Sequence, residues 1–489
     1  MFVVLLLILR IKVQYVAAVT FAFTALIAIV KWSLPLAYLG SAVGKGSLIT
    51  LDILLIIFGA IIFLNYLKKI GVISQLESLL SSLSLDRRIQ AILLAWFFGS
   101  FIEGTSGFGT PALVVAPLLV GIGFPALMSI LICLVANSTA VAFGAVGTPV
   151  RVGFAELAIS GIPEKAALIN LLAGGVVPLL IVAFVVGSDR KRRVKAFFEC
   201  VPWALFAGLS FLLPYYFISY LGYEFPSIFG SAIGLGLAVV SIRFNFLIPK
   251  SVFRFQSDNP IILPELSGRF LKALKPYLLL LVILLGGKML FSSWRIPFEL
   301  GHGLVHSVQV FNPGFAFLTA ILILNFKNAV PLSEFVILAR SSFALIRKSA
   351  VAIFCVAAMT YTLVLTDLSS TEGMLQVIAK PLANQNLPFF SVFIGAFGSF
   401  LAGSATVSNL LLGPIQAQAA EQLGYSLPWI LALQLVGAGV GNMIALPNLL
   451  AVAAAVGLHD QESHLLRRLI LPCFLYLVLA AIIGQIIIN

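Results

Sequence analysis

Long apolar runs occur from one end of the chain to the other, and they leave few folds open to it. Runs such as 48–67 and 273–285 are too apolar and too numerous to share the core of a water-soluble domain. Of the 489 residues, 61% are hydrophobic and only 10% are charged, against about 25% charged in ordinary soluble domains. The chain is therefore predicted to be an all-α polytopic membrane protein.

The runs predict about 11–13 transmembrane helices. The uninterrupted candidate spans are 13–30, 48–66, 124–147, 166–187, 197–221, 227–242, 273–291, 308–324, 349–365, 428–455 and 467–487. Two further apolar segments, 89–122 and 389–424, are interrupted by glycine, proline and hydroxyl residues, and we expect both to be re-entrant hairpins. Residues 1–12 are too short to span and form an N-terminal apolar stub, unless the natural start lies upstream.

Basic residues gather in loops, which sets the expected orientation. The net charge is +12, and its clusters lie at 68–88, 190–195, 243–275 and 467–468. By the positive-inside rule these loops lie in the cytoplasm. The first hairpin then opens from the cytoplasm and the second from outside. Residues 334–348 mix charged and apolar side chains, as an interfacial helix does. No basic surface with aromatic or polar base readers indicates nucleic-acid binding.

The two hairpins belong to an internal repeat. Gly-Ser-Phe-Ile-Glu-Gly-Thr-Ser at 99–106 is echoed by Gly-Ser-Phe-Leu-Ala-Gly-Ser-Ala at 398–405, 299 residues later. The first repeat covers 13–187 with its hairpin, and the second covers 308–487. Seven spans separate their starts, and because seven is odd the repeats have opposite orientations. This inverted-repeat plan is typical of secondary transporters, whose substrate site lies where the repeats meet.

Residues 188–291 belong to neither repeat. They hold three intervening helices and the proline-containing cytoplasmic loop 243–275. Two roles stay open for these helices: bracing a scaffold, or forming the contact of a homodimer.

The interrupted stretch of the first hairpin predicts a substrate site. Gly104, Thr105, Ser106 and Gly107 offer hydroxyl donors and a backbone that a ligand can approach closely. A broken helix also presents an N-terminus whose partial positive charge suits a carboxylate. The alternative is a small-residue face for close helix packing. The recurrence of the pattern in both halves favours binding.

Glu103 is the one carboxylate deep in this hairpin. A charge at the bilayer centre costs roughly 2.5–3.5 kcal/mol on insertion scales, so such residues are usually functional. We expect Glu103 to carry a coupled proton. The alternative is a structural acid that stays protonated or caps a helix.

Further polar residues are expected to complete the site. They are Asn137, Ser138 and Thr139 after the first hairpin, with Gly403, Ser404, Thr406, Ser408, Asn409 and Asn442 in the second half. Each could instead bond a helix carbonyl. No cysteine or histidine spacing indicates a metal site, no catalytic set indicates an enzyme, and no cofactor is expected beyond the proton gradient.

Three stretches of the chain resemble the L-lactate permease family. They are Phe-Ile-Glu-Gly-Thr-Ser-Gly-Phe-Gly-Thr-Pro at 101–111, Pro-Leu-Leu-Val-Gly-Ile-Gly-Phe-Pro at 117–125, and Phe-Gly-Ala-Val-Gly-Thr-Pro at 143–149. The resemblance covers nearly the whole chain. It implies a proton symporter for L-lactate, and for glycolate or related 2-hydroxy monocarboxylates, in a prokaryotic plasma membrane. It also implies an elevator motion, in which a hairpin-bearing domain slides against a scaffold.

The chain departs from the family pattern in its second half. Ala405 stands where the family usually has aspartate, Val407 where it has serine, and Asn442 where it has lysine. Loss of one acid and one base is coherent if the two normally pair. Two alternatives to lactate symport follow: a carrier of another small organic or inorganic anion, and a membrane sensor that binds lactate without transport.

Overall fold

The computed structural model describes residues 13–107, 109–155, 157, 159–187, 193–255, 269–291, 293–302, 304–369, 372–458 and 461–488. The expected stub 1–12 and residues 256–268 of the expected cytoplasmic loop lie outside this part. The described chain is helical apart from one antiparallel β-hairpin, β1 (Arg295–Glu299) and β2 (Val305–Gln309), in which Pro297 faces Ser307. The all-α prediction holds for the membrane-spanning elements.

The chain divides into two compact units. Unit 1 takes the described residues of Met1–Ile73, Leu271–Gln385 and Leu410–Gly424. Unit 2 takes those of Ser74–Phe270, Asn386–Asn409 and Tyr425–Asn489. Each unit thus combines residues from both predicted repeats, and the repeat boundaries themselves stay a prediction.

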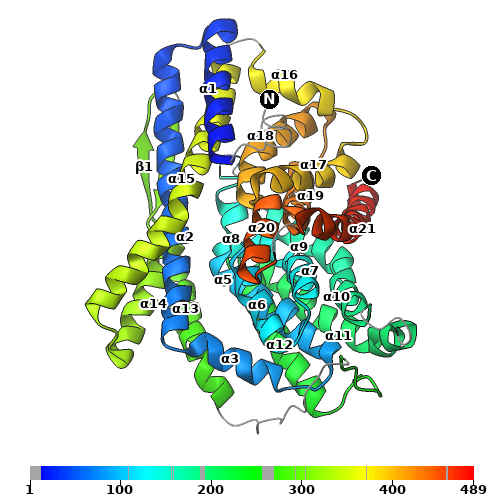
Figure 1. Ribbon diagram of the computed structural model, residues 1–489. Helices are drawn as coiled ribbons and strands as arrows, with labels where there is room; N and C mark the ends of the chain where they lie inside the picture. The colour runs from blue at the N-terminus through cyan, green and yellow to red at the C-terminus, as the bar shows by residue number, and fades with distance from the viewer. Residues whose placement is uncertain are drawn as a thin grey trace. The chain divides into compact units, whose positions relative to one another are not determined.

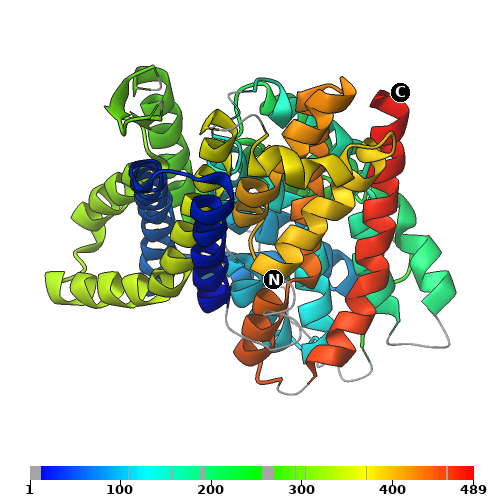
Figure 2. The ribbon, with the colours of Figure 1, turned by 90° about the horizontal axis from the view of Figure 1, so that it is seen from above.

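Unit 1 is built on long helices that lie side by side (Figures 1 and 2). They are α1 (Val13–Trp32), α2 (Leu36–Lys69), α14 (Pro313–Asn328) and α15 (Leu332–Ser369). Glycines let them approach closely: a Cβ on Gly46 would lie 2.8 Å from the backbone nitrogen of Ala358. α15 joins the predicted interfacial segment 334–348 and the span 349–365 in one helix, because no glycine or proline between them ends it. Residues 334–348 are therefore not a helix of their own, and their interfacial position stays a prediction.

Lys45 is a buried cation in the middle of this bundle, with only 2% of its surface exposed. Its Nζ donates to the carbonyl oxygen of Val305 on β2 at 3.0 Å. The same ammonium lies 4.8 Å from the ring centroid of Tyr361 on α15. A charge on an apolar span needs such partners, so the β-hairpin and α15 stabilise the charge that α2 carries.

Each predicted hairpin has two helical arms, and the arms are joined at glycines that the sequence analysis singled out. In unit 2 the first hairpin consists of α4 (Arg87–Ala91), the π-helical η2 (Ile92–Phe98), α5 (Gly99–Ser106) and α6 (Thr110–Gly121). Its break includes Gly107 and Gly109, both at positive φ. In the second hairpin α17 (Leu387–Ala402) ends at Gly403 with φ +68° and α18 (Ala405–Leu423) follows. Only residues without a Cβ adopt this conformation freely.

The span after each hairpin is broken in the same way. α7 (Ala126–Asn137) continues through the 3-10 turn η3 (Ala140–Phe143) into α8 (Gly144–Arg151), with a bend of 54°. α19 (Leu427–Gly441) continues through η5 (Asn442–Ile444) into α20 (Leu446–Ala455). Both breaks were predicted from glycine and proline. The first, however, starts several residues before the predicted Gly144–Pro149.

Other helices of unit 2 surround these broken elements. They are α3 (Val72–Ser81), which starts in unit 1, α9 (Ile162–Ala173), α10 (Val176–Val186), α11 (Arg193–Ser219), α12 (Pro226–Arg243) and α21 (Glu462–Ile488). α12 packs against α5, since a Cβ on Gly104 would lie 2.7 Å from Cγ1 of Ile228. This part of the intervening region therefore braces the first hairpin, whereas α13 (Arg269–Phe291) belongs largely to unit 1. A dimer contact stays a prediction.

Short elements escaped the prediction. α3, α16 (Met374–Ala379) and the 3-10 turn η4 (Lys380–Leu382) are too short, or too polar, to be read as spans. Among the described residues seven helices are long and apolar enough to cross a membrane, or up to ten if each bent pair is one span. This count covers the described residues only and rests on length and composition, so it does not contradict the expected 11–13 transmembrane helices. The protein is a polytopic helical membrane protein.

Candidate functional site

A small cavity in unit 2 collects residues from both hairpin tips and both broken spans. Its lining consists of Glu103, Gly107, Val141, Gly144, Ala145, Pro149, Gly403, Ser404, Ala405, Thr406 and Asn442. The volume open to the centre of a water molecule is about 20 Å³, which is room for one or two waters. Residues almost 300 positions apart in the chain thus share one site.

Glu103 is the acidic group of this cavity. It is 2% exposed, and its Oε2 accepts a hydrogen bond from Nδ2 of Asn137 at 3.0 Å. Gly144 lies directly against the other oxygen: a Cβ there would overlap Oε1 and lie 3.2 Å from Cδ. The carboxyl group is therefore held by an amide on one side and by a residue without a side chain on the other.

The N-terminus of α18 faces the same cavity. Gly403, Ser404, Ala405 and Thr406 all contribute to the lining. The Ser404 hydroxyl caps the helix by accepting from the backbone N–H of Val407, at 3.4 Å. First-turn N–H groups lack acceptors within the helix and carry partial positive charge. This end of the cavity is suited to a carboxylate.

A left-handed stretch shapes the opposite wall. Ala145 and Val146 have φ of 44° and 54°, and Gly147 follows at 73°. Left-handed conformation is a genuine outlier for β-branched valine, and such strain concentrates at functional sites. The Thr148 hydroxyl donates to the carbonyl oxygen of Ala145 at 2.5 Å and so supports the turn. The turn presents Ala145 and Pro149 to the cavity.

Some predicted residues meet at the cavity and others do not. Glu103, Gly107, Gly403, Ser404, Thr406 and Asn442 line it, and Asn137 reaches it through Glu103. Gly104, Thr105, Ser106, Ser138, Thr139, Ser408 and Asn409 are not among its lining residues. The lining residues that the sequence analysis missed are Val141, Gly144, Ala145, Pro149 and Ala405. Gly144, Ala145 and Pro149 belong to the Gly-Ala-Val-Gly-Thr-Pro run at 144–149, which could have indicated them.

Two of the predicted residues outside the lining bond backbone carbonyls of their own helix, whereas the buried Ser106 hydroxyl has no hydrogen-bond partner among the described residues. Thr105 bonds the carbonyl oxygens of Phe101 and Ile102, and Ser138 bonds that of Val135. Gly104 packs against α12, as described above. These contacts match the alternative that the sequence left open, in which a hydroxyl bonds its own helix.

Ser408 and Asn409 tie elements together behind the cavity. The Ser408 hydroxyl donates to the carbonyl oxygen of Gly395 on α17 at 2.9 Å. The Asn409 amide donates to the carbonyl oxygen of Pro149 at 3.0 Å, and its own oxygen accepts from Nε2 of Gln434 at 3.2 Å. Asn409 therefore links the second hairpin to the break after the first.

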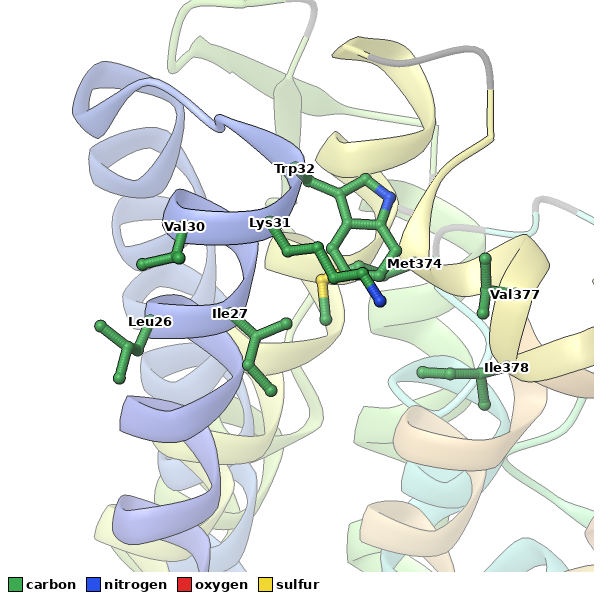
Figure 3. A pocket seen from close by; sticks show the side chains of 8 residues that line it. All are labelled: Leu26, Ile27, Val30, Lys31, Trp32, Met374, Val377 and Ile378. Atoms are coloured by element: carbon green, nitrogen blue, oxygen red, sulfur yellow. The ribbon is translucent and has the colours of Figure 1, made fainter.

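A larger pocket lies in unit 1, between α1 and α16, with a volume of about 520 Å³ (Figure 3). Its walls are apolar side chains: Leu26, Ile27, Val30, Met374, Val377 and Ile378. The polar lining residues are Lys31 and Trp32, and the Trp32 indole already donates to the carbonyl oxygen of Glu372 at 2.8 Å. Such walls do not suit a small hydroxy acid, so the hairpin cavity is the candidate site.

Comparison of the sequence with known protein families identifies the family of this chain. The family model for L-lactate permease matches residues 1–298 and 299–489. The chain belongs to the L-lactate permease family. Proteins of this family are permeases, that is, transporters, and the chain is a multi-pass protein of the bacterial plasma membrane. The resemblance inferred from the 101–149 motifs is confirmed.

Three relatives illustrate the range of the family. The L-lactate permease of Escherichia coli K12 is 30% identical over 501 residues, 94% of this chain and 89% of its own length. The glycolate permease GlcA of the same strain is 28% identical, over 99% of this chain and 92% of its own. The L-lactate permease of Bacillus subtilis is 29% identical, over 85% and 81%.

Two of the three departures from the family pattern noted in the sequence belong to the lining, and Val407 does not. Ala405 and Asn442 both face the cavity. The Asn442 side-chain oxygen accepts from Nδ2 of Asn448 at 2.6 Å, so Asn442 is one member of an amide pair. Ala405 packs with Val141 and Ala438 in a small apolar cluster. Glu103 is thereby the one ionisable side chain among the described lining residues.

Proposed function

We propose that this permease is a proton-coupled symporter that imports L-lactate, and glycolate or related 2-hydroxy monocarboxylates, into the cell. The names of the relatives support the substrate class. The observation that carries the proposal is the cavity in which Glu103 faces the N-terminus of α18. Glu103 can take up a proton while the N-terminus of α18 binds the carboxylate of the substrate. Symport of an acid with a proton needs both.

In this proposal the substrate carboxylate binds at the first turn of α18. The backbone N–H groups of Ala405 and Thr406 and the hydroxyls of Ser404 and Thr406 are the donors. The methyl group of lactate lies towards Val141 and Ala405, and its hydroxyl towards Asn442. Each hydrogen bond contributes about 0.5–1.5 kcal/mol, so we expect a Kd in the micromolar to millimolar range.

Glu103 carries the coupled proton in this proposal. A neutral Glu103 leaves the cavity free of negative charge, which favours binding of a carboxylate. An ionised Glu103 repels it, because two unit charges a few ångströms apart in a poorly solvated site interact strongly. Substrate and proton are therefore released together on the side where the proton concentration is lower.

Transport in this proposal proceeds by an elevator motion. The lining residues all belong to unit 2, so this unit can move with its substrate as one body. The cavity of about 20 Å³ is smaller than a six-heavy-atom anion needs. We infer that a hairpin tip opens to admit substrate and closes before the move, with Gly403 and Gly107 as hinge positions.

Uptake of radiolabelled L-lactate by the purified protein in liposomes tests the proposal. We expect accumulation above the equilibrium level when an inward proton gradient is imposed, and only equilibration without it. Dissipating the gradient with a protonophore is the matched control. If lactate only equilibrates whether or not the proton gradient is imposed, the protein carries lactate without proton coupling.

A second candidate is carriage of a different small anion, because two of the three departures from the family pattern, Ala405 and Asn442, line the cavity. Competition with labelled lactate by a panel of glycolate, pyruvate, acetate, a dicarboxylate and an inorganic oxyanion separates the two candidates. Lactate or glycolate competing best supports the first. A stronger competitor without a 2-hydroxyl group supports the second.

A further inference from the structure

Four buried residues of unit 2 form a closed ring of hydrogen bonds, made by their side chains and one backbone carbonyl. They are Thr139 between α7 and η3, Asn170 on α9, Tyr215 on α11 and Tyr476 on α21, and each is at most 1% exposed. The Tyr215 hydroxyl lies 3.1 Å from the carbonyl oxygen of Thr139 and 3.0 Å from Nδ2 of Asn170. The Tyr476 hydroxyl lies 2.9 Å from Oδ1 of Asn170 and 3.0 Å from Oγ1 of Thr139.

Counting donors fixes the direction of every bond in the ring. A tyrosine hydroxyl has one hydrogen to donate. Tyr215 gives its hydrogen to the Thr139 carbonyl, so it accepts from the Asn170 amide. Tyr476 gives its hydrogen to the Asn170 oxygen, so it accepts from the Thr139 hydroxyl. Each of the four bonds then has one donor and one acceptor, and a satisfied buried network of this kind is rigid.

The ring is attached where the helix after the first hairpin breaks. Asn137, which holds Glu103, is two residues before Thr139, and the lining residues Val141 and Gly144 follow within five. The next carbonyl, that of Ala140, accepts from the hydroxyl of Ser227 on α12 at 2.7 Å. Side chains of neighbouring helices thus fix two consecutive carbonyls at the start of η3.

The space around the ring is filled. A Cβ on Gly174, between α9 and α10, would lie 2.9 Å from the Tyr476 hydroxyl and 3.3 Å from Oγ1 of Thr139. The glycine at 174 therefore leaves room for the two hydroxyls and for little else.

We propose that this ring, which we call the tyrosine ring, positions the substrate site. It holds the break between α7 and α8 so that Asn137 reaches Glu103 and the left-handed turn faces the cavity. Tyr215, Asn170 and Tyr476 are positioning residues: they touch neither substrate nor Glu103. The inference rests on the proposed function for its transport readout, and it adds residues that neither the cavity lining nor the motifs include.

Conservative variants test the ring. Tyr215→Phe and Tyr476→Phe each remove one hydroxyl and keep the aromatic ring. We expect each to raise the KM for lactate uptake about three- to tenfold, the effect of one ordinary hydrogen bond. Tyr216→Phe is the matched control, since its hydroxyl pairs with that of Tyr220 on the exposed side of the same helix. The control should keep the wild-type KM.

The KM separates positioning from folding. A merely structural role would lower the number of folded carriers, and therefore the maximal rate per sample, with an unchanged KM. An unchanged KM in both ring variants overturns the inference. The double variant should raise KM by less than the product of the single effects, because the ring is already open after one substitution. A fully multiplicative effect would contradict a single closed ring.

Amide hydrogen exchange tests the tyrosine ring independently, because the measurement requires neither a folding assay nor a transport assay. We expect both ring variants to speed amide exchange across 137–148 selectively, as measured by mass spectrometry, and the control to leave it unchanged. If wild-type protein carries no lactate or glycolate, the proposed function fails and this exchange pattern alone decides on the ring. If wild-type transport is normal and exchange across 137–148 is unaltered in the variants, the ring inference fails and the function stands.

Discussion

At the scale of single residues, the cavity depends on one acid. Glu103 accepts from Asn137 and lies against Gly144, so a glutamine fits the same space and keeps a hydrogen-bonding oxygen. Glu103→Gln should therefore fold normally but carry no proton. We expect gradient-driven accumulation to fall at least about tenfold, while lactate–lactate exchange without a gradient is retained. Accumulation and exchange measured on one liposome preparation check this, and loss of both together would argue for a structural role.

The uncharged lining residues Ala405 and Asn442 allow a second prediction, on the stability of variants at these positions. Ala405→Asp alone buries an unpaired carboxylate beside Glu103, and a lone buried charge costs about 3–5 kcal/mol. Adding Asn442→Lys supplies a partner in the same cavity, since both positions line it. We expect the single variant to lower the apparent melting temperature and the double variant to recover most of it. Thermal unfolding of the detergent-purified proteins measures this, and no recovery would mean that the two positions do not pair.

Much of the site could be predicted at this scale, and the misses have a common cause. Glu103, Gly107, Gly403, Ser404, Thr406 and Asn442 were recognised because polar or small residues interrupt apolar sequence. The same criterion also selected hydroxyls that bond their own helix, such as Thr105 and Ser138. Composition cannot tell which side of a helix a hydroxyl faces. Apolar lining residues such as Val141 carry no chemical signal in the sequence.

At the scale of elements, glycines govern how closely helices pack. α17 and α19 approach through Gly395, Gly437 and Gly441: a Cβ on Gly437 would lie 2.8 Å from Cα of Val392. Gly437→Ala should therefore lower the free energy of unfolding by about 1–3 kcal/mol through overpacking. Gly236→Ala on α12 is the matched control, because a Cβ there meets nothing within 4 Å. Chemical or thermal unfolding that treats both variants alike would contradict this packing.

Helices were predictable where a rule of local chemistry applies. Glycine and proline located both hairpin breaks and both broken spans. Two features had no such rule behind them: the π-helical turn Ile92–Phe98 and the left-handed Val146. Tertiary contacts decide these conformations, and a single sequence does not display them.

At the scale of the whole molecule, the chain is organised differently from its repeats. Hydropathy and a constant offset predicted two successive halves, whereas each compact unit draws on both halves. An internal repeat is visible in a sequence because it recurs along the chain. Which elements move together depends on contacts between distant segments, which no periodicity reveals.

Distances between labels test the elevator motion. Cysteines replacing Lys327 in unit 1 and Val194 in unit 2 report on the two units, and Val194 with Leu471 reports within unit 2. The native cysteines at 133, 200, 355 and 473 are buried, which limits unwanted labelling. We expect the pair across the units to populate more than one distance under lactate and a proton gradient, while the control pair keeps one. Single-molecule energy transfer measures both, and a single distance for each pair would exclude the elevator.

The buried lysine of α2 also says something about how the protein is made. Two of its partners, the Val305 carbonyl and the Tyr361 ring, lie 260 and 316 residues further along the chain. At roughly 5–20 residues per second, a ribosome needs about 13 s or more to reach even the first of them. The second helix is therefore synthesised well before these two partners of its ammonium group. An insertase or lipid headgroup that shelters this charge would be a requirement of biogenesis rather than of transport.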